Sequence, residues 1–272
     1  MGELGQDFMA TAGRPAAERR LADPVVRSIT VTDVNEAWAQ GLRDFQAAPL
    51  YGLAFGALYA AGGIAIVLSV TAAGLSYLAY PLAAGFALIG PFAAVGLYEV
   101  SRRREAGIPL SWLGVFGVIF AQRNRQLGWM AFVTLFIFMV WMYQAQLLLA
   151  LFLGPRSFAS INDLLTVLTT TPQGLAFLLI GNIVGALLSL ALFSLTLVSF
   201  PLLLDRDVDF VTAMITSVRA VVTNPAATIG WGITIGITLI LASLPFFLGL
   251  MIALPILGHA TWHLYRRLVE PA

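Results

Sequence analysis

The sequence predicts an all-α fold, a polytopic membrane helix bundle with six transmembrane helices in three hairpins, each preceded by a cytoplasmic amphipathic helix. Hydrophobic residues make up 59% of the chain and charged residues only 11%, against about 45–50% and about 25% in ordinary soluble domains. The apolar residues come in long runs without a formal charge, and arginines separate these runs. Such a chain needs lipid around it, so it is expected in a bilayer.

The first two spans are expected in the uncharged run between Asp44 and Glu99. A helix needs about 20 apolar residues to cross about 30 Å of hydrocarbon, and this run is long enough for two. We place the spans at residues 50–71 and 77–98. Residues 1–28 hold arginines but no apolar segment, which predicts a flexible cytoplasmic tail rather than a signal peptide.

Four further spans are expected in the rest of the single membrane domain, residues 29–272. The run between Arg125 and Arg156 fits one crossing, and the next run fits one long or tilted helix. The run after Arg219 is too long for one helix, and Pro245 interrupts it. These four spans are placed at residues 127–153, 174–204, 226–244 and 245–264.

The positions of arginine predict the orientation. With six spans, 14 of the 15 cationic residues, all of them arginine, fall on one side, and Arg156 is the exception. Short cytoplasmic loops carry the positive excess in membrane proteins. We therefore expect a multi-pass protein of the bacterial inner membrane with both termini in the cytoplasm.

Three amphipathic segments precede the predicted hairpins, at residues 33–48, 108–121 and 209–222. Each places apolar residues at helical spacing on one face, as in helices that lie in the headgroup plane.

The first and third units also repeat in sequence at constant spacing. Asp33, Ala37, Arg43, Pro49 and Gly56 recur as Asp209, Ala213, Arg219, Pro225 and Gly232. Pro81, Gly85, Pro91, Arg102 and Arg103 recur as Pro245, Gly249, Pro255, Arg266 and Arg267. The pattern predicts an internal parallel repeat of an amphipathic helix followed by a hairpin.

Two spaced motifs carry a family resemblance. The first is Gly90-Pro91 followed by GLYEVSRR at residues 96–103. The second is PLLLDR at residues 201–206, followed by Ala213, Ser217, Ala220 and Asn224-Pro225. Over roughly residues 27–267 the chain resembles a bacterial family of predicted integral membrane proteins of unknown function, common in alphaproteobacteria. More distantly, it is similar to the six-helix membrane domain attached to glycerophosphodiester phosphodiesterases. The resemblance implies a membrane fold and no particular substrate.

A few polar residues are candidates for a functional site. His259 and His263 share one helical face and could bind a metal or haem. Without a nearby carboxylate or cysteine, we favour an interfacial, hydrogen-bonded pair. Charged residues at helix ends could gate a pathway or bind lipid headgroups, although anchoring of the helix ends is the simpler interpretation. The remaining candidates are Glu99, Arg102, Asp205, Arg206, Arg219 and Asn182, the last an amide inside an apolar helix.

The sequence contains no sign of catalysis. It has no cysteine, which excludes disulfides and thiolate sites, and no catalytic triad or phosphate-binding loop appears, so we predict no enzyme and no cofactor. A net charge of +1 predicts no nucleic-acid binding. We favour a non-catalytic accessory or scaffold module whose partners are membrane lipid and another membrane protein complex. The alternative is a channel or carrier for a small, weakly polar solute.

Overall fold

The computed structural model describes residues 23–75, 90–122, 126–154 and 161–271, with the single residues 78, 82 and 86. Throughout this part of the chain the regular structure is helical, and the isolated bridge between Val26 and Val269 is the only β pairing. The all-α prediction is therefore confirmed. The helices are α3 (Val31–Ala47), α4 (Pro49–Ala72), α6 (Gly90–Glu105), α7 (Trp112–Gln122), α8 (Gln126–Leu153), α9 (Ile161–Thr170), α10 (Pro172–Thr196), α11 (Ser199–Asp205), α12 (Phe210–Thr223), α13 (Pro225–Ser243) and α14 (Leu250–Leu268).

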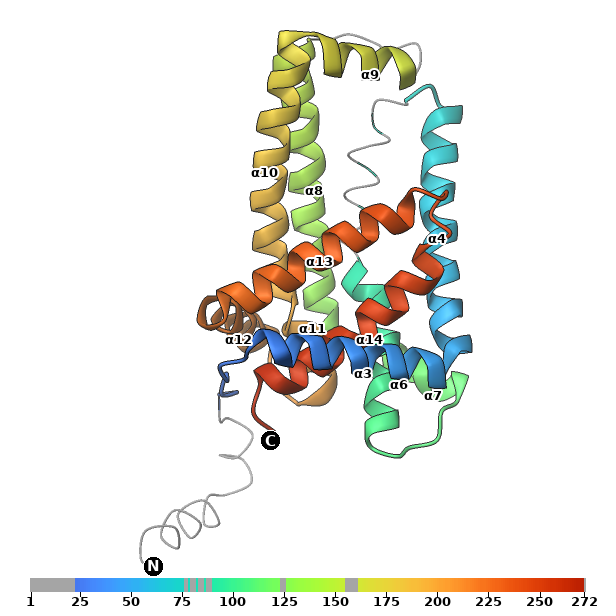
Figure 1. Ribbon diagram of the computed structural model, residues 1–272, viewed down its shortest axis with the longest axis vertical. Coiled ribbons are helices and arrows are strands. Elements are labelled where there is room, and N and C mark those ends of the chain that lie inside the picture. The colour runs from blue at the N-terminus through green and yellow to red at the C-terminus, as the bar shows by residue number, and fades with distance from the viewer. Residues whose placement is uncertain are drawn as a thin grey trace, which may run out of the picture.

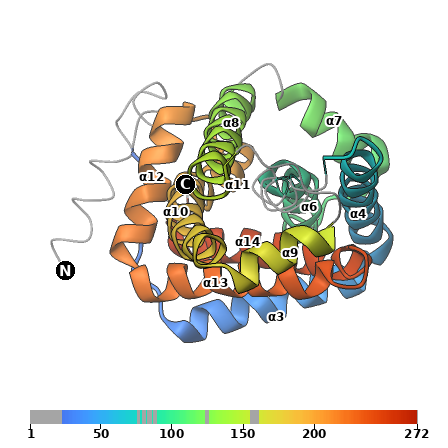
Figure 2. The same ribbon diagram turned by 90° about the horizontal axis from the view of Figure 1, so that it is seen from above.

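The helices define one long axis (Figure 1). α4, α8 and α10 run along it, whereas α3 lies across one end and α9 across the other. Seen from above, α7 and α12 also lie across the molecule, and α8 stands beside α10 (Figure 2). The three predicted amphipathic segments thus correspond to α3, α7 and α12, which gather at the same end. The final pair, α13 and α14, forms a hairpin that is oblique to the axis.

Within the described residues, four helices are long and apolar enough to cross a membrane. They are α4, α8, α10 continued into α11 (Pro172–Asp205), and α13. They coincide with the first, third, fourth and fifth predicted spans. Ten of the 22 residues of the second predicted span, 77–98, lie outside the described residues, and its last nine residues form the start of α6. Six crossings remain a prediction.

The sixth predicted span, residues 245–264, differs from the structure. Residues 244–249 form a turn, so α14 begins at Leu250 and continues to Leu268. Two histidines and two arginines lie within this helix, and it is not among the four apolar helices. Most residues from Leu254 onward are buried against protein. The sequence predicted a sixth membrane span beginning at Pro245, whereas α14 begins at Leu250 and is packed in the centre of the fold.

Glycines let α14 approach its neighbours closely. A Cβ added to Gly41 of α3 would lie 2.4 Å from the backbone nitrogen of Ala260, and one added to Gly56 of α4 would lie 2.6 Å from the Cα of Met251. Side chains cannot occupy such spaces, so helix backbones meet where glycine is present. α14 is consequently packed between α3 and α4.

The starts of α3 and α12 follow from local sequence. The Thr30 hydroxyl accepts a hydrogen bond from the N–H of Asp33, whose carboxylate accepts one from the N–H of Thr30, which forms a capping box. At α12, the Asp209 carboxylate accepts bonds from the N–H groups of Val211 and Thr212. Such caps satisfy backbone donors that have no partner inside the helix.

Candidate functional site

Asp44 connects three helices through its carboxylate. Its Oδ2 accepts a hydrogen bond from Ser101 Oγ of α6 at 2.7 Å and from His263 Nε2 of α14 at 2.7 Å. Its Oδ1 accepts a bond from Arg104 Nε at 2.9 Å. Asp44 is only 7% exposed, and it lies on the face of α3 that packs against α14. Because an unpaired buried charge is costly, this carboxylate stabilises the fold only while its donors are in place.

His259 extends this chain of hydrogen bonds. Its Nδ1 lies 2.8 Å from Ser101 Oγ. Since the Ser101 hydroxyl donates to Asp44, its oxygen accepts the proton of His259 Nδ1. His259 is fully buried, and its Nε2 has no hydrogen-bond partner among the described residues. In a nucleophilic triad the histidine lies between serine and carboxylate, whereas here the serine lies between them. The order of the groups therefore differs from that of a nucleophilic triad.

The hydrogen bonds change the acidity of Asp44. Burial raises the pKa of its carboxyl group, but the bonds from His263, Ser101 and Arg104 outweigh burial and hold the pKa well below the usual 3.8. Asp44 is therefore a carboxylate at neutral pH, and a carboxylate can only accept. His263 must then donate the hydrogen bond between them.

Glu99 lies in the second half of α6 and is completely buried. Its carboxylate oxygens accept bonds from Arg102 Nε at 2.7 Å, from Arg102 Nη2 at 3.0 Å and from Arg103 Nε at 2.6 Å. Both arginines lie within about one turn of the same helix. Two guanidinium groups compensate one buried carboxylate here, which is the condition for tolerating a buried charge.

A second cluster joins α6, α11 and α14. Asp205 Oδ2 accepts bonds from the Tyr265 hydroxyl at 2.7 Å and from Arg266 Nη1 at 3.1 Å. Arg266 Nε also donates to Glu105 at 3.0 Å, and Glu105 in turn accepts a bond from Trp262 Nε1 at 3.0 Å. Trp262, Tyr265 and Arg266 of α14 thus each form a hydrogen bond with a residue of another helix, either α6 or α11.

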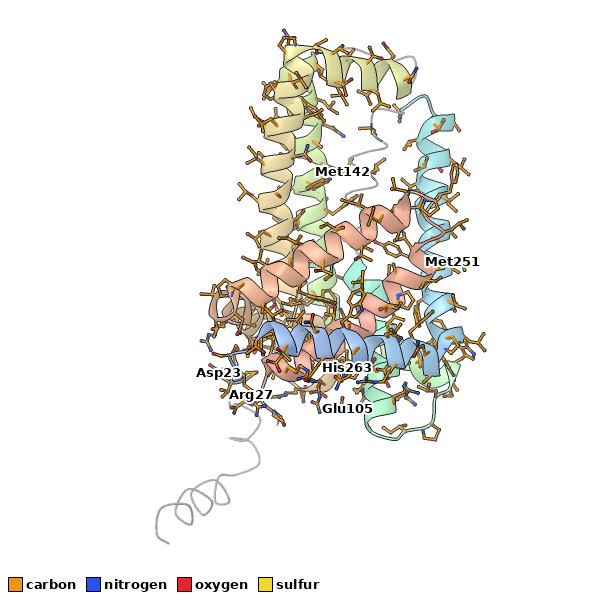
Figure 3. All side chains as sticks on the ribbon, in the orientation of Figure 1. Asp23, Arg27, Glu105, Met142, Met251 and His263 are labelled. Atoms are coloured by element: carbon orange, nitrogen blue, oxygen red, sulfur yellow. The ribbon has the colours of Figure 1, made fainter. Side chains whose placement is uncertain are left out.

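Arg267 completes the contacts of α14. Its guanidinium pairs with Asp33 at 3.0 Å and with Glu36 at 2.7 Å, both on α3. Figure 3 shows His263 and Glu105 at the end of the molecule where α3 lies, together with Asp23, whereas Met142 lies farther along the axis on α8. These separate hydrogen-bonded clusters gather at one end of the molecule, and together we call them the basal network: Asp33, Glu36, Asp44, Glu99, Ser101, Arg102, Arg103, Arg104, Glu105, Asp205, His259, Trp262, His263, Tyr265, Arg266 and Arg267.

Three sequence candidates lie outside or at the edge of the basal network. Arg206 Nε is buried without a hydrogen-bond partner among the described residues, 3.9 Å from Asp205 Oδ2, and the guanidinium also donates to the backbone carbonyl of Glu270. Arg219 is exposed and pairs with Asp23 at 3.7 Å. Asn182 is exposed on α10 and donates to the carbonyl of Leu178 in its own helix.

Arg206 also lines a polar pocket of about 340 Å³. The other lining residues are Gln126, Leu203, Leu204, Asp205, Asp207 and Val208. The charged groups of the lining are two carboxylates, Asp205 and Asp207, and one guanidinium, Arg206. No group of three or more metal-ligating side chains occurs in the described parts of the chain.

Sequence reasoning did not select Asp44, Ser101 or Tyr265. A signal was present for Asp44, which is seven residues after Ala37 and three after Gly41, and thus on the apolar stripe of its helix. A carboxylate on that stripe must face either lipid or a buried partner. For Ser101 and Tyr265 the partners are too far away in sequence to be recognised.

Taken together, the fold and the basal network define an all-helical, multi-pass integral membrane protein with its ionic contacts gathered at one end. Residues 79–205 match the model of a family described as "Predicted integral membrane protein (DUF2189)". No curated protein and no solved structure matches the chain. The match contains the first family motif and supports the resemblance to a membrane family of unknown function. The alphaproteobacterial link and the similarity to phosphodiesterase membrane domains stay predictions.

A Tyr265→Phe substitution tests the second cluster. It removes the hydroxyl that donates to Asp205, and a hydrogen bond to a charged group contributes about 1.5–3 kcal/mol. We expect a loss of that size in thermal or denaturant unfolding of the detergent-purified protein. The matched control is Tyr143→Phe on α8, where the side chain is 70% exposed. Equal effects of the two substitutions would contradict the role given to Tyr265.

Proposed function

We propose that the protein is a non-catalytic membrane module that packs with another membrane complex or organises lipid. The distribution of ionisable side chains carries this proposal. The four apolar helices hold no Asp, Glu, Arg or His except Asp205 at the end of α11. Ionisable residues at membrane depth mark most ion and proton pathways, so a pathway along these helices lacks the groups that it would need.

The burial of the polar groups also argues against catalysis. Glu99, Ser101 and His259 have no exposed surface, so a substrate could not reach them without rearrangement of the helices. Their hydrogen bonds join α3, α6 and α14. In our proposal the basal network holds the end of the bundle rigid, and the apolar outer faces of the helices contact the partner complex or lipid.

The proposal includes an orientation, with the basal network facing the cytoplasm of a bacterial cell. The arginines of this end are the positive excess that cytoplasmic loops carry. Asp23 and the C-terminus both lie at this end (Figures 1 and 3), and Arg27 N–H donates to the Leu268 carbonyl at 2.8 Å.

We also propose that α3–α4 and α12–α13 are two copies of one unit. Ala48 and Asn224, the residues between the two helices of each unit, have similar backbone angles, with φ of −136° and −125° and ψ of 53° in both. A proline opens the second helix in each unit, because its fixed φ suits the first helical position. This shared joint supports duplication of an amphipathic helix and an apolar helix.

The experiment that tests the function separates a module from a carrier. The tagged protein is purified from native membranes in mild detergent, and its protein and lipid content is measured. A stoichiometric protein partner, or a retained lipid class that differs from the bulk membrane, is the expected result. In parallel, the protein alone is reconstituted in liposomes, and glycerol entry is compared with that into empty liposomes. Glycerol flux above the empty control, without partner or lipid enrichment, would overturn the proposal in favour of the carrier.

A further inference from the structure

We propose that the hairpin of α13 and α14 enters the bilayer from the end of the basal network and turns back inside the hydrocarbon. Its tip, residues 244–249, then contacts lipid acyl chains instead of water on the far side. This inference concerns a lipid-binding surface and the number of crossings, and it holds whatever partner the proposed module has.

The depth of the tip follows from its contacts with α4. A Cβ added to Gly56 would meet Met251 at 2.6 Å, and one added to Gly63 would meet Phe247 at 2.8 Å. The tip is therefore level with Gly63. α4 continues for nine residues beyond Gly63, to Ala72, or about 13 Å at about 1.5 Å per residue. The hairpin thus ends well before the end of a helix that is itself able to span the membrane.

The composition of the tip suits hydrocarbon. Residues 244–249 read Leu-Pro-Phe-Phe-Leu-Gly, without a polar side chain. Leu244 is 73% exposed, Phe246 82% and Leu248 56%. Turns in water favour Gly, Pro, Asn, Asp and Ser. An exposed turn with four large apolar side chains instead matches acyl chains.

Three backbone N–H groups of the turn find acceptors within the hairpin. The N–H of Phe246 donates to Leu244 O at 2.9 Å, that of Phe247 to Ser243 O at 3.0 Å and that of Leu248 to Pro245 O at 3.0 Å. Pro245 has no N–H to satisfy. Backbone polar groups in hydrocarbon must find partners within the protein.

The turn also needs a rare backbone conformation. Phe246 and Phe247 have φ of 52° and 64°, a region that bulky residues seldom adopt. These angles bring the local donors and carbonyls together. A glycine or asparagine would adopt them more readily, so the use of two phenylalanines favours a tip selected for contact with apolar surroundings.

The arginine distribution is the same for a re-entrant hairpin and for two crossings, because both return the chain to the side from which it entered. Charge counting therefore could not distinguish them. The position of the tip along α4 distinguishes the two arrangements.

Single cysteines test the inference, since the chain has none of its own. The test variant is Phe246→Cys, with Leu244→Cys as a second exposed position should the first fail to fold. Thr169→Cys on α9 and Asp207→Cys after α11 are exposed controls at the two ends. A membrane-impermeant maleimide is applied to sealed spheroplasts and to inverted vesicles, and labelling is repeated after solubilisation in SDS.

We expect each control to label from one face only, and the tip cysteine to label from neither until SDS is added. A spin label at the tip should be relaxed by oxygen, which dissolves in hydrocarbon, and not by a water-soluble nickel chelate. Labelling from the face of Thr169→Cys would show that the hairpin crosses. Labelling from the face of Asp207→Cys would show that the tip is not inserted, and protection without relaxation by oxygen would show that protein covers it. Each of these three results would overturn the proposal.

Discussion

A Gly41→Ala substitution is expected to destabilise the protein by about 3 kcal/mol, at the upper end of what overpacking usually costs. The added Cβ would lie 2.4 Å from the Ala260 nitrogen and 2.7 Å from its Cα. These are backbone atoms of a buried helix, so they cannot move aside as a flexible side chain could. α14 must shift as a whole, and its contacts with α3 and α4 must change with it. Thermal unfolding in mild detergent measures the loss.

Gly236→Ala in α13 is the matched control for this substitution. Nothing lies within 4 Å of the Cβ that it would add, and alanine is the better helix former by about 1 kcal/mol. The control should therefore be neutral or slightly stabilising. If Gly41→Ala behaved in the same way, α3 and α14 could not be packed as closely as the structure has them.

An Asp44→Asn substitution is expected to cost about 3–5 kcal/mol, the range found when one partner of a buried ion pair is removed. The amide keeps the shape of the carboxylate, but it leaves His263 and Arg104 without the negative charge that they face. The control is Glu36→Gln. The Glu36 side chain is 57% exposed and pairs with Arg267. Exposed pairs contribute only about 0–1 kcal/mol.

Asp44 also gives the stability a dependence on pH. Because the pKa of its carboxyl group in the folded protein lies below the usual value of 3.8, the folded state favours the charged form. The stabilisation is complete above the unfolded pKa and is lost as the pH falls below 3.8 towards the folded pKa. Asp44→Asn should lack this part of the acid-induced loss. An unchanged acid profile in the variant would show that other carboxyl groups account for it, such as Asp33 and Asp209, whose pKa values are also lowered, mainly by their hydrogen bonds with Thr30 and Thr212.

The sequence by itself determined the class and the apolar helices of this protein. Uncharged runs predicted α4, α8, α10 and α13, since burying an apolar run in lipid requires no knowledge of its neighbours. The start of α4 was equally readable, because Pro49 lies at its first turn. Such features depend on composition and on residues a few positions apart.

Only the tertiary structure decided the partners of Asp44. They are Ser101, 57 residues away, Arg104, 60 residues away, and His263, 219 residues away. No pattern of spacing specifies contacts over such separations, because they depend on how α14 is placed between α3 and α4. The two histidines were recognised as a pair on one face, but their carboxylate could be found only after the helices were packed.

The depth of the last hairpin was also decided only in three dimensions. Its uncharged run is long enough for two crossings, and its arginines would lie on the same side either way. A re-entrant hairpin differs from two crossings in the depth at which the chain turns. Glycines of α4 set this depth. Gly56 and Gly63 of α4 meet Met251 and Phe247, and these contacts stop the turn about 13 Å before the end of α4 at about 1.5 Å per helical residue.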